Sequence, residues 1–213
     1  MKILIITQYF WPENFRINDL AKELVNRGYK VDVLTGQPNY PDGKFYNGYS
    51  FKFSNEIFSG INIIRVPIIP RGTNYFTLSL NYLSYAVFAS LYILFNKGKY
   101  QNIFSVNYSP ITSLIPAIIG KIKFKIKLFI WVQDLWPESV KAVTKKDYKI
   151  VNYLLNKLVK TIYYYSDKIL ISNKGFEKSI TKKKVKKNKI KFMPNWAEDV
   201  FDNLDDIDSK KYK

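Results

Sequence analysis

The pattern Gln-x-x-Trp-Pro-Glu occurs twice in the sequence, as QYFWPE at residues 8–13 and as QDLWPE at residues 133–138. Each copy directly follows an apolar run, so each is expected to begin where a buried strand ends. The proline keeps the tryptophan before it out of helical geometry and marks a loop. A tryptophan ring offers a flat apolar face, while Gln, Asp and Glu side chains form hydrogen bonds with hydroxyl groups. A sugar has apolar ring faces and a rim of hydroxyl groups, so this combination suits sugar binding.

The same residues also have a purely structural interpretation. The tryptophans would then cap the core, and the acidic side chains would cap the N-termini of helices. Both interpretations are open for either loop alone. Two such loops at one edge of a sheet favour a binding role.

The composition excludes several kinds of catalysis. The chain has no cysteine and no histidine, which removes disulfides, thiolate metal sites, a cysteine nucleophile and the usual general base. Ser-His-Asp and zinc chemistry are therefore excluded, and no cofactor is expected. Neither a P-loop nor a dinucleotide-binding fingerprint follows the first apolar run. That run is too short for the apolar core of a signal peptide, which predicts a cytoplasmic protein.

The elements that must position these loops form a simple pattern. Helical patterns lie between most of a set of short β-type runs, which predicts an α/β fold with a doubly wound, mostly parallel sheet covered on both faces. One helix is expected after Asn18 and should stop at Gly28. Others are expected at Ile111–Ile119, Ile150–Tyr165 and Gly175–Lys182. The expected strands are Lys2–Thr7, Val31–Leu34, Ile61–Val66, Ile103–Val106, Leu128–Val132, Lys168–Ser172 and Ile190–Met193.

In such a sheet, ligands bind beyond the carboxyl ends of the strands, near the point where the strand order reverses. Both Gln-x-x-Trp-Pro-Glu loops leave such ends, and the loop NYSP at residues 107–110 should lie between them. Residues 12–19 run into the first predicted helix, whose N-terminal N–H groups attract anions. Arg16 would add a charged fork there, or it would pair with Asp19.

Charge is distributed unevenly along the chain. Residues 1–196 carry 31 Lys and Arg against 11 Asp and Glu, whereas residues 197–213 carry six acids and three lysines. We expect a single domain at 1–196, followed by an acidic tail or the start of a linker. The basic part suggests an anionic partner, either nucleic acid, an anionic membrane surface or a phosphorylated substrate. Solvated surface lysines remain an open alternative, also for the lysine-rich run at 182–191.

Residues 78–95 are apolar almost all round the predicted helix, with Arg71, Lys97 and Lys99 on either side. Eighteen residues reach the lower limit for a membrane span, but Asn81 and several Ser and Tyr residues argue against one. We favour a core helix. A helix lying in the plane of a membrane surface is the second interpretation.

Four stretches together resemble a known family. Residues 2–49, 131–140 (WVQDLWPESV), 169–180 (ILISNKGFEKSI) and 191–196 (KFMPNW) resemble, in that order, the N-terminal half of GT-B glycosyltransferases of family 4. The likeness is greatest to bacterial enzymes that assemble O-antigen, capsule or colanic-acid polysaccharide, including amino-sugar transferases. It covers residues 1 to about 200.

The resemblance implies a fold and a reaction. Such enzymes have two Rossmann-like domains facing a cleft, of which the N-terminal one mainly binds the acceptor and the C-terminal one holds the nucleotide-sugar donor. They transfer the sugar with retention of configuration and without a metal. We therefore expect a nucleotide-sugar donor, a lipid-linked glycan acceptor, and a protein on the inner face of the membrane.

The resemblance also implies roles for the second loop. Many relatives have His-Asp after the corresponding strand, where this sequence has Gln133-Asp134, so an amide that can only position a ligand replaces the imidazole. Asp134 and Glu138 become the candidate catalytic residues, which bind the acceptor hydroxyl or shape its pocket. Gln133 and Trp136 are candidate acceptor-binding residues of the same loop.

Other loops at the same edge complete the expected site. Asn39 and Tyr40, in the loop GQPNYPDG, should line the acceptor side together with Tyr108. Relatives usually carry a Gly-Gly pair near the donor phosphates after the first strand. The residues at that place here are the candidate donor-phosphate residues, namely Glu13, Asn14 and Arg16.

Family members carry a second domain of similar size, which we expect to lie outside this chain. The sequence would then be a piece of a longer protein, a truncated gene product or one half of a split enzyme, inactive by itself. Two other functions stay open. A basic nucleic-acid-binding α/β module fits the net charge and the 32 Phe and Tyr residues, although no zinc-finger or RNP-type motif is present. A non-catalytic subunit that recruits a donor-binding partner to the membrane is the third possibility.

Overall fold

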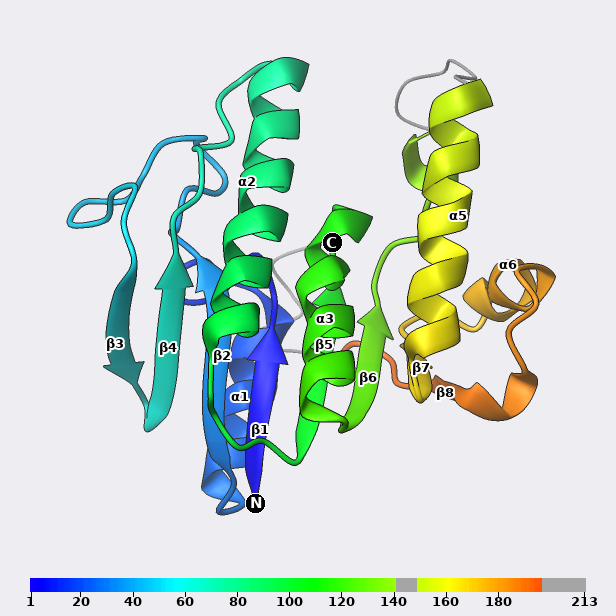
Figure 1. Ribbon diagram of the computed structural model, residues 1–213, viewed down its shortest axis with the longest axis horizontal. Helices are drawn as coiled ribbons and strands as arrows, with labels where there is room; N and C mark the ends of the chain where they lie inside the picture. The colour runs from blue at the N-terminus through cyan, green and yellow to red at the C-terminus, as the bar shows by residue number, and fades with distance from the viewer. Residues whose placement is uncertain (141–148, 197–213) are drawn as a thin grey trace, which may run out of the picture.

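The structure, a computed structural model, describes residues 1–140 and 149–196. The acidic segment 197–213 lies outside the described residues. An eight-stranded sheet runs through the molecule in the order β3-β4-β2-β1-β5-β6-β7-β8 (Figure 1). Neighbouring strands are parallel except for the antiparallel pair β3–β4. The strands are β1 (Lys2–Ile6), β2 (Lys30–Gly36), β3 (Ser54–Phe58), β4 (Ile61–Val66), β5 (Asn102–Asn107), β6 (Lys127–Val132), β7 (Lys168–Ile171) and β8 (Ile190–Phe192).

All the predicted strands are confirmed, with ends that differ by at most two residues. One strand, β3, was not predicted. Its sequence SNEIF alternates half-buried and exposed side chains at the edge of the sheet. A strand with so few apolar residues does not stand out as an apolar run.

Helices cover both faces of the sheet, as predicted. In Figure 1, α2, α3 and α5 lie in front of the sheet and α1 lies behind it. The α-helices are α1 (Arg16–Asn26), α2 (Tyr75–Phe95), α3 (Ile115–Phe124), α5 (Lys149–Tyr165) and α6 (Phe176–Lys182), and two short 3-10 helices are η1 (Ile111–Leu114) and η2 (Lys187–Lys189). The α1 helix stops as expected, because Gly28 has a φ of 82°, a left-handed conformation that glycine adopts without strain.

The side chains of β1 show how the sheet holds its two layers. Leu4 and Ile6 belong to the core on the side of α2, α3 and α5, while Ile3 and Ile5 belong to the core beneath α1. Successive side chains of a strand point to opposite faces, so a run without polar residues must be covered on both sides. Each of these buried side chains contributes about 2 kcal/mol to folding.

The apolar segment 78–95 lies within α2, which begins after Asn74. The side chain of Asn74 accepts a hydrogen bond of 2.8 Å from the backbone N–H of Thr77 and caps the helix. One side of α2 packs against the sheet through Tyr85, Ala89 and Ile93, as the core-helix interpretation requires. Among the described residues, α2 is the one helix long and apolar enough to cross a membrane, a weak criterion that core helices also meet.

Candidate functional site

Five loops meet at the carboxyl edge of the parallel strands, which is the upper end of the sheet in Figure 1. They follow β1, β2, β4, β5 and β6. The strand order reverses beside β1, because the chain passes from β1 to β2 on one side and later returns to β5 on the other. The predicted placement of the loop at 107–110 between the two Gln-x-x-Trp-Pro-Glu loops is confirmed. This is the place where an open α/β sheet binds its ligand.

A chain of buried amides holds three of these loops together. The Gln8 side chain donates to Asn81 Oδ1 at 2.8 Å, and Asn81 Nδ2 donates to Asn39 Oδ1 at 3.3 Å and to the backbone oxygen of Ile69 at 2.6 Å. Asn39 Oδ1 also accepts from the backbone N–H of Arg71 at 2.9 Å. Asn39, predicted to line the acceptor pocket, is therefore 1% exposed and positions the loops from beneath.

Glu13, like Asn39, is buried beneath the loops. Its Oε1 atom accepts hydrogen bonds from the backbone N–H groups of Asn39 and Tyr40, both at 2.8 Å. Burial raises the pKa of the Glu13 carboxyl to about 7, although these hydrogen bonds and the charge of Arg65 act in the opposite direction. The carboxyl group predicted to lie near the donor phosphates thus contacts the backbone of the neighbouring loop.

Arg65 completes this support and was not singled out from the sequence. Its side chain is fully buried, forms an ion pair with Glu56, and donates to the backbone oxygens of Gly36, at 2.9 Å, and Trp11. Its guanidinium lies 4.9 Å from the ring centre of Tyr49. The signal in the sequence was an arginine near the end of the largely apolar strand INIIRV.

Four aromatic rings form a cluster above the ends of β1, β2 and β5. Tyr9 stacks on Phe15 at 5.2 Å between ring centres, Phe15 lies 4.9 Å from Tyr108, and Tyr40 lies 5.5 to 5.6 Å from Phe15 and Tyr9. Tyr40 is 37% exposed, so its ring is open to a ligand. Sequence reasoning named Tyr40 and Tyr108. It missed Tyr9, inside the first Gln-x-x-Trp-Pro-Glu pattern, and Phe15, between that pattern and the first helix.

The start of α1 is partly occupied by the chain itself. The Tyr108 hydroxyl accepts a hydrogen bond of 3.0 Å from the N–H of Ile17, and the N–H of Asn18 donates to the oxygen of Phe15 at 2.9 Å. Burial raises the pKa of Tyr108, so its hydroxyl stays protonated. Arg16 begins the helix with its Nη1 atom 3.6 Å from an Asp19 oxygen, which was the alternative that the sequence left open. The neighbouring Asn14 is exposed.

Arg71 places a positive charge beside the aromatic cluster. Its guanidinium lies 5.3 Å from the ring centre of Tyr40. Burial raises the pKa of the Tyr9 hydroxyl and the charge of Tyr82 adds to this, whereas Arg71 acts to lower that pKa. None of the ion pairs between residues of 1–140 and 149–196 involves Arg71. Arg71 therefore presents a positive charge beside an exposed aromatic ring.

Tyr82 connects this region with the second loop. Burial raises the pKa of its hydroxyl, a side-chain hydrogen bond with Ser109 lowers it, and the charge of Asp134 raises it. Asp134 accepts a hydrogen bond from Ser139 Oγ, and its backbone oxygen accepts from Asn107 Nδ2 at 2.9 Å. The structure thus brings Asp134 to the same edge as the hydroxyl of Tyr82.

Glu138 has different partners. Its Oε1 atom accepts from Ser179 Oγ at 2.6 Å and from Lys183 Nζ, at the end of α6. Partial burial acts to raise the pKa of Glu138, but the hydrogen bonds from Lys183 and Ser179 outweigh it and hold the pKa below its usual value. The two predicted catalytic carboxylates therefore engage separate parts of the chain.

The remaining residues of the second loop are partly buried. Gln133 Oε1 accepts a hydrogen bond of 3.0 Å from Asn195 Nδ2, which joins the loop to the segment MPNW. Trp136 packs against the larger core, and Trp11 of the first loop stacks on Phe58 at 4.2 Å. For both tryptophans, these contacts agree with the structural interpretation. In the described ranges 1–140 and 149–196, no group of three acidic side chains is placed to hold a metal ion.

Comparisons with solved structures find the same fold in proteins of low sequence identity. Sucrose-phosphate synthase from Thermosynechococcus elongatus is 15% identical with a TM-score of 0.55, over 95% of this chain and 52% of that one. HepE of Anabaena, solved in complex with UDP, is 12% identical with a TM-score of 0.50, over 93% of this chain and 45% of that one. UDP-N-acetylglucosamine 2-epimerase from Rickettsia bellii is 13% identical with a TM-score of 0.55, over 96% of this chain and 47% of that one.

The chain thus spans about half the length of these proteins. One of them is an epimerase, so the fold alone does not identify the reaction. A search of curated proteins finds no match. The sequence model of the family described as "Glycosyltransferase Family 4", however, matches residues 15–199. The chain therefore belongs to glycosyltransferase family 4 and forms an N-terminal, Rossmann-like half of the GT-B fold.

Proposed function

We propose that this chain is the acceptor-binding half of a glycosyltransferase that moves a sugar from a nucleotide-sugar to a glycan acceptor. Membership of the family supports the reaction class. The observation that carries the acceptor role is the exposed ring of Tyr40 beside the Arg71 guanidinium, at the edge where the strand order reverses. An aromatic ring stacks on the apolar face of a sugar, and the neighbouring charge orients polar groups on its rim.

Asp134 is the residue we assign to the acceptor hydroxyl. Its carboxylate lies at the same edge as Tyr82 and Ser109, which supply hydroxyl groups for positioning. Glu138 would shape this loop through its contacts with α6. Gln133 would hold the loop against the segment MPNW, and Trp136 would hold it against the larger core.

The donor is proposed to be a nucleotide-sugar held mainly by a second domain. HepE, which shares the fold, was solved with UDP. On this chain Arg16 and Asn14, at the start of α1, would face the donor phosphates, and Glu13 would fix the loop that carries them. Transfer is proposed to proceed with retention and without a metal.

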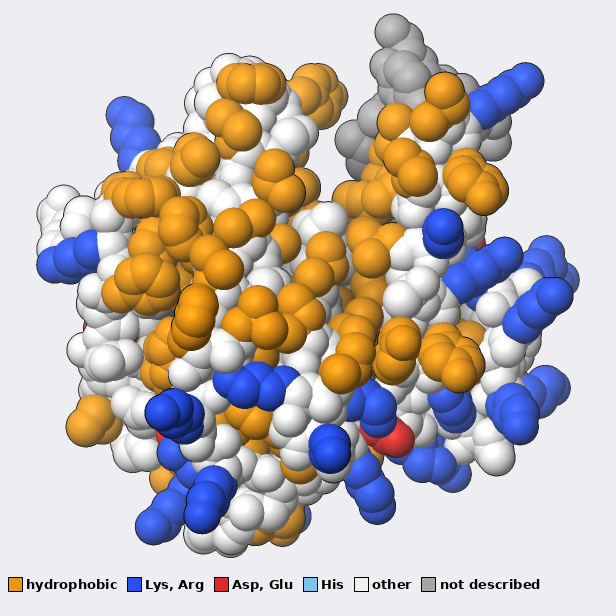
Figure 2. Space-filling model, viewed as in Figure 1, with side chains coloured by type: hydrophobic (Ala, Val, Ile, Leu, Met, Phe, Trp, Pro, Cys, Tyr) orange, Lys and Arg blue, Asp and Glu red, His pale blue; other side chains and the backbone are white. Residues whose placement is uncertain are grey.

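The acceptor is proposed to be lipid-linked, in the synthesis of a surface polysaccharide, with the protein peripheral on the inner face of the membrane. Support comes from the outer side of α2, where Leu83, Val87, Leu91 and Leu94 are 42% to 59% exposed. Figure 2 shows apolar side chains spread over this face of the molecule, with Lys and Arg side chains mainly below and to the right of them and very few acidic groups. Apolar surface framed by positive charge suits an anionic lipid surface.

The test is transfer by the full-length protein, supplied with its second domain in the same or a separate chain. Purified protein is incubated with a panel of nucleotide-sugars and lipid-linked acceptors, and the products are identified by mass spectrometry. Transfer with one donor, and inhibition by its nucleoside diphosphate, is the expected result. No transfer with any donor, together with tight and salt-sensitive binding of generic DNA, would overturn the proposal.

A further inference from the structure

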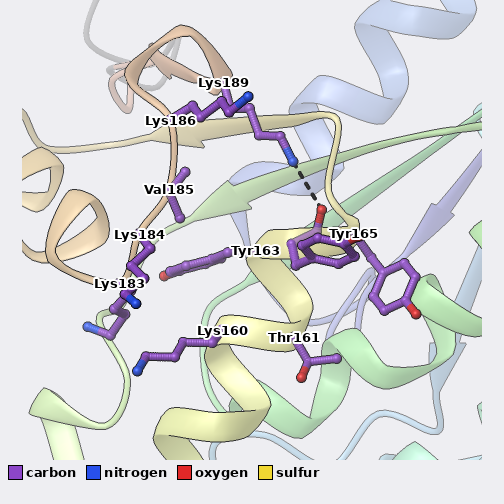
Figure 3. A pocket seen from close by; sticks show the side chains of 10 residues that line it. Lys160, Thr161, Tyr163, Tyr165, Lys183, Lys184, Val185, Lys186 and Lys189 are labelled. Atoms are coloured by element: carbon purple, nitrogen blue, oxygen red, sulfur yellow. Dashed lines mark hydrogen bonds between the residues drawn. The ribbon is translucent and has the colours of Figure 1, made fainter.

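A cavity lies between the end of α5 and the connection from α6 to β8 (Figure 3). Its volume is about 750 Å³. Five lysines line it together with tyrosine rings and Val185. They are Lys160, Lys183, Lys184, Lys186 and Lys189, and we call the cavity the lysine pocket.

The hydroxyl of Tyr163 is the first sign that the lysine pocket takes a ligand. Tyr163 is 1% exposed, and its hydroxyl has no hydrogen-bond partner among the described residues. Figure 3 shows this hydroxyl pointing from α5 toward Lys183 and Lys184. Burial raises the pKa of Tyr163, as do the charges of Glu138 and Asp134, so the hydroxyl keeps its proton and remains a donor. Buried polar groups are rarely left unpaired, so a buried donor in this position indicates a ligand that accepts its hydrogen bond.

The lysines supply more positive charge than the surrounding chain neutralises. The Lys183 side chain is 7% exposed and binds Glu138. Lys189 donates to the backbone oxygens of Tyr164 and Ser166. The other three take part in none of the ion pairs between residues of 1–140 and 149–196, namely Lys160, Lys184 and Lys186.

We propose that the lysine pocket binds the phosphate or diphosphate group of a ligand, as a site separate from the one at the carboxyl edge. Ammonium groups on flexible side chains can converge on the oxygens of a phosphate, and the Tyr163 hydroxyl adds a neutral donor from the floor. The tyrosine rings and Val185 give the rest of the ligand an apolar wall. The phosphate belongs either to a soluble molecule or to the headgroup of an anionic lipid.

The pocket is coupled to the second Gln-x-x-Trp-Pro-Glu loop through Lys183. A phosphate that approaches Lys183 competes with Glu138 for the same ammonium group. Binding in the pocket and the Glu138–Lys183 contact therefore oppose each other, and removing the Glu138 charge must strengthen phosphate binding.

The first test is calorimetric titration of the full-length protein with inorganic pyrophosphate. We expect one site, with affinity reduced roughly tenfold in the double variant Lys160→Gln and Lys184→Gln. The matched control is the double variant Lys157→Gln and Lys178→Gln, because both lysines are exposed and neither lines the pocket. Equal losses in the variant and the control would show attraction to net charge and would overturn the proposal.

Two further variants separate a site from general basicity. Tyr163→Phe keeps the buried ring and should lower the affinity several-fold, whereas Tyr153→Phe, at an exposed position of α5, should not. Glu138→Gln should raise the affinity several-fold. If Tyr163→Phe and Glu138→Gln both bind pyrophosphate as the wild type does, the assignment is wrong.

The source of the phosphate is decided with vesicles. If the ligand is a lipid headgroup, phosphatidylglycerol vesicles should bind and pyrophosphate should compete, with the same dependence on Lys160 and Lys184. If it is a soluble molecule, pyrophosphate should bind and these lysines should not affect binding to vesicles. Failure of both pyrophosphate and vesicles to bind would overturn the proposal for the lysine pocket. Failure of sugar transfer together with binding of generic DNA would overturn only the proposed function.

Discussion

At the scale of single residues, Glu13 gives a prediction about stability and pH. The folded-state pKa of about 7 lies above the ordinary value of 4.5, because burial penalises the charged form. A raised carboxyl pKa means that the folded state binds the proton more tightly than the unfolded state does. The stability that this tighter proton binding contributes is fully present below pH 4.5 and is lost as the pH rises through 7.

Replacing Glu13 by glutamine should therefore remove part of the pH dependence. The amide oxygen can still accept from the N–H groups of Asn39 and Tyr40, and no charge is buried at high pH. We expect Glu13→Gln to be more stable than the wild type at pH 8 by about 2 kcal/mol, and close to it at pH 5. Urea unfolding at both pH values measures this, and parallel pH profiles for the two proteins would refute it.

A second residue-scale prediction concerns the two carboxylates of the second loop. Asp134→Asn should reduce transfer by about a hundredfold without changing the melting temperature, because it removes a charge proposed to contact the acceptor hydroxyl. Glu138→Gln should have a smaller effect, because Glu138 binds Ser179 and Lys183. Steady-state kinetics on the complete enzyme give the comparison, with the half-buried Glu177→Gln on α6, whose carboxylate lies 3.7 Å from Lys187, as the control. Unchanged turnover in both loop variants would remove the site assignment.

The sequence predicted which residues lie at the edge but not what they touch. Asn39, Tyr40 and Tyr108 all lie there, yet only Tyr40 has an exposed ring, and the Asn39 side chain is turned into the buried network. The direction of a loop side chain depends on partners distant in sequence, such as Asn81, and no local pattern encodes them. From the sequence, Arg71 was noted only as a charge beside the apolar segment 78–95, because no local pattern shows that it lies beside the ring of Tyr40.

At the scale of elements, Arg65 holds β3, β4 and the first loop together. Arg65→Met would leave the oxygens of Gly36 and Trp11 without their donors and Glu56 without its partner. We expect a loss of about 3 kcal/mol in the free energy of unfolding. Arg65→Lys should recover only part of it, because an ammonium group cannot reproduce the planar fork.

The matched control for Arg65 is Arg27→Met. Arg27 is a surface residue at the end of α1 that pairs with Glu23, and exposed pairs of this kind have little effect on stability. Denaturant unfolding of the three variants is the measurement. If Arg65→Met is as stable as Arg27→Met, the buried network does not stabilise the loops.

The elements were more predictable than the site. Buried parallel strands are continuous apolar runs, and such runs show directly in the sequence. The exception, β3, pairs only with β4 at the edge and contains Ser, Asn and Glu. Its position is set by pairing and by the Glu56–Arg65 contact, which sequence periodicity does not reveal.

At the scale of the whole molecule, α2 has an unusual surface. Its exposed residues Leu83, Val87, Leu91 and Leu94 recur every three or four positions and so form one stripe along the helix. Phe51 and Phe53 extend the apolar surface and contact Phe88, with which they lie edge to face. A surface helix normally carries polar residues on its outer side, so an apolar stripe this long marks an interaction surface.

The stripe should bind an anionic lipid surface. Leu91→Gln with Leu94→Gln should weaken binding to phosphatidylglycerol vesicles about tenfold, because each side chain loses its apolar contact with lipid. Stability should not fall, since both side chains are exposed in the free protein. Ile57→Gln, an exposed isoleucine on β3, is the control.

Vesicle flotation and sedimentation velocity together distinguish lipid from protein as the occupant of the stripe. Lipid binding predicts that the wild type floats with anionic vesicles. It also predicts that the wild type and the Leu91→Gln, Leu94→Gln double variant have the same mass in solution. If the wild type instead forms a dimer that the double variant abolishes, the stripe is a contact between two copies of the chain. The membrane proposal would then be wrong, while Tyr40, Arg71 and Asp134 would keep their proposed roles, because they lie at the carboxyl edge and not on the outer side of α2.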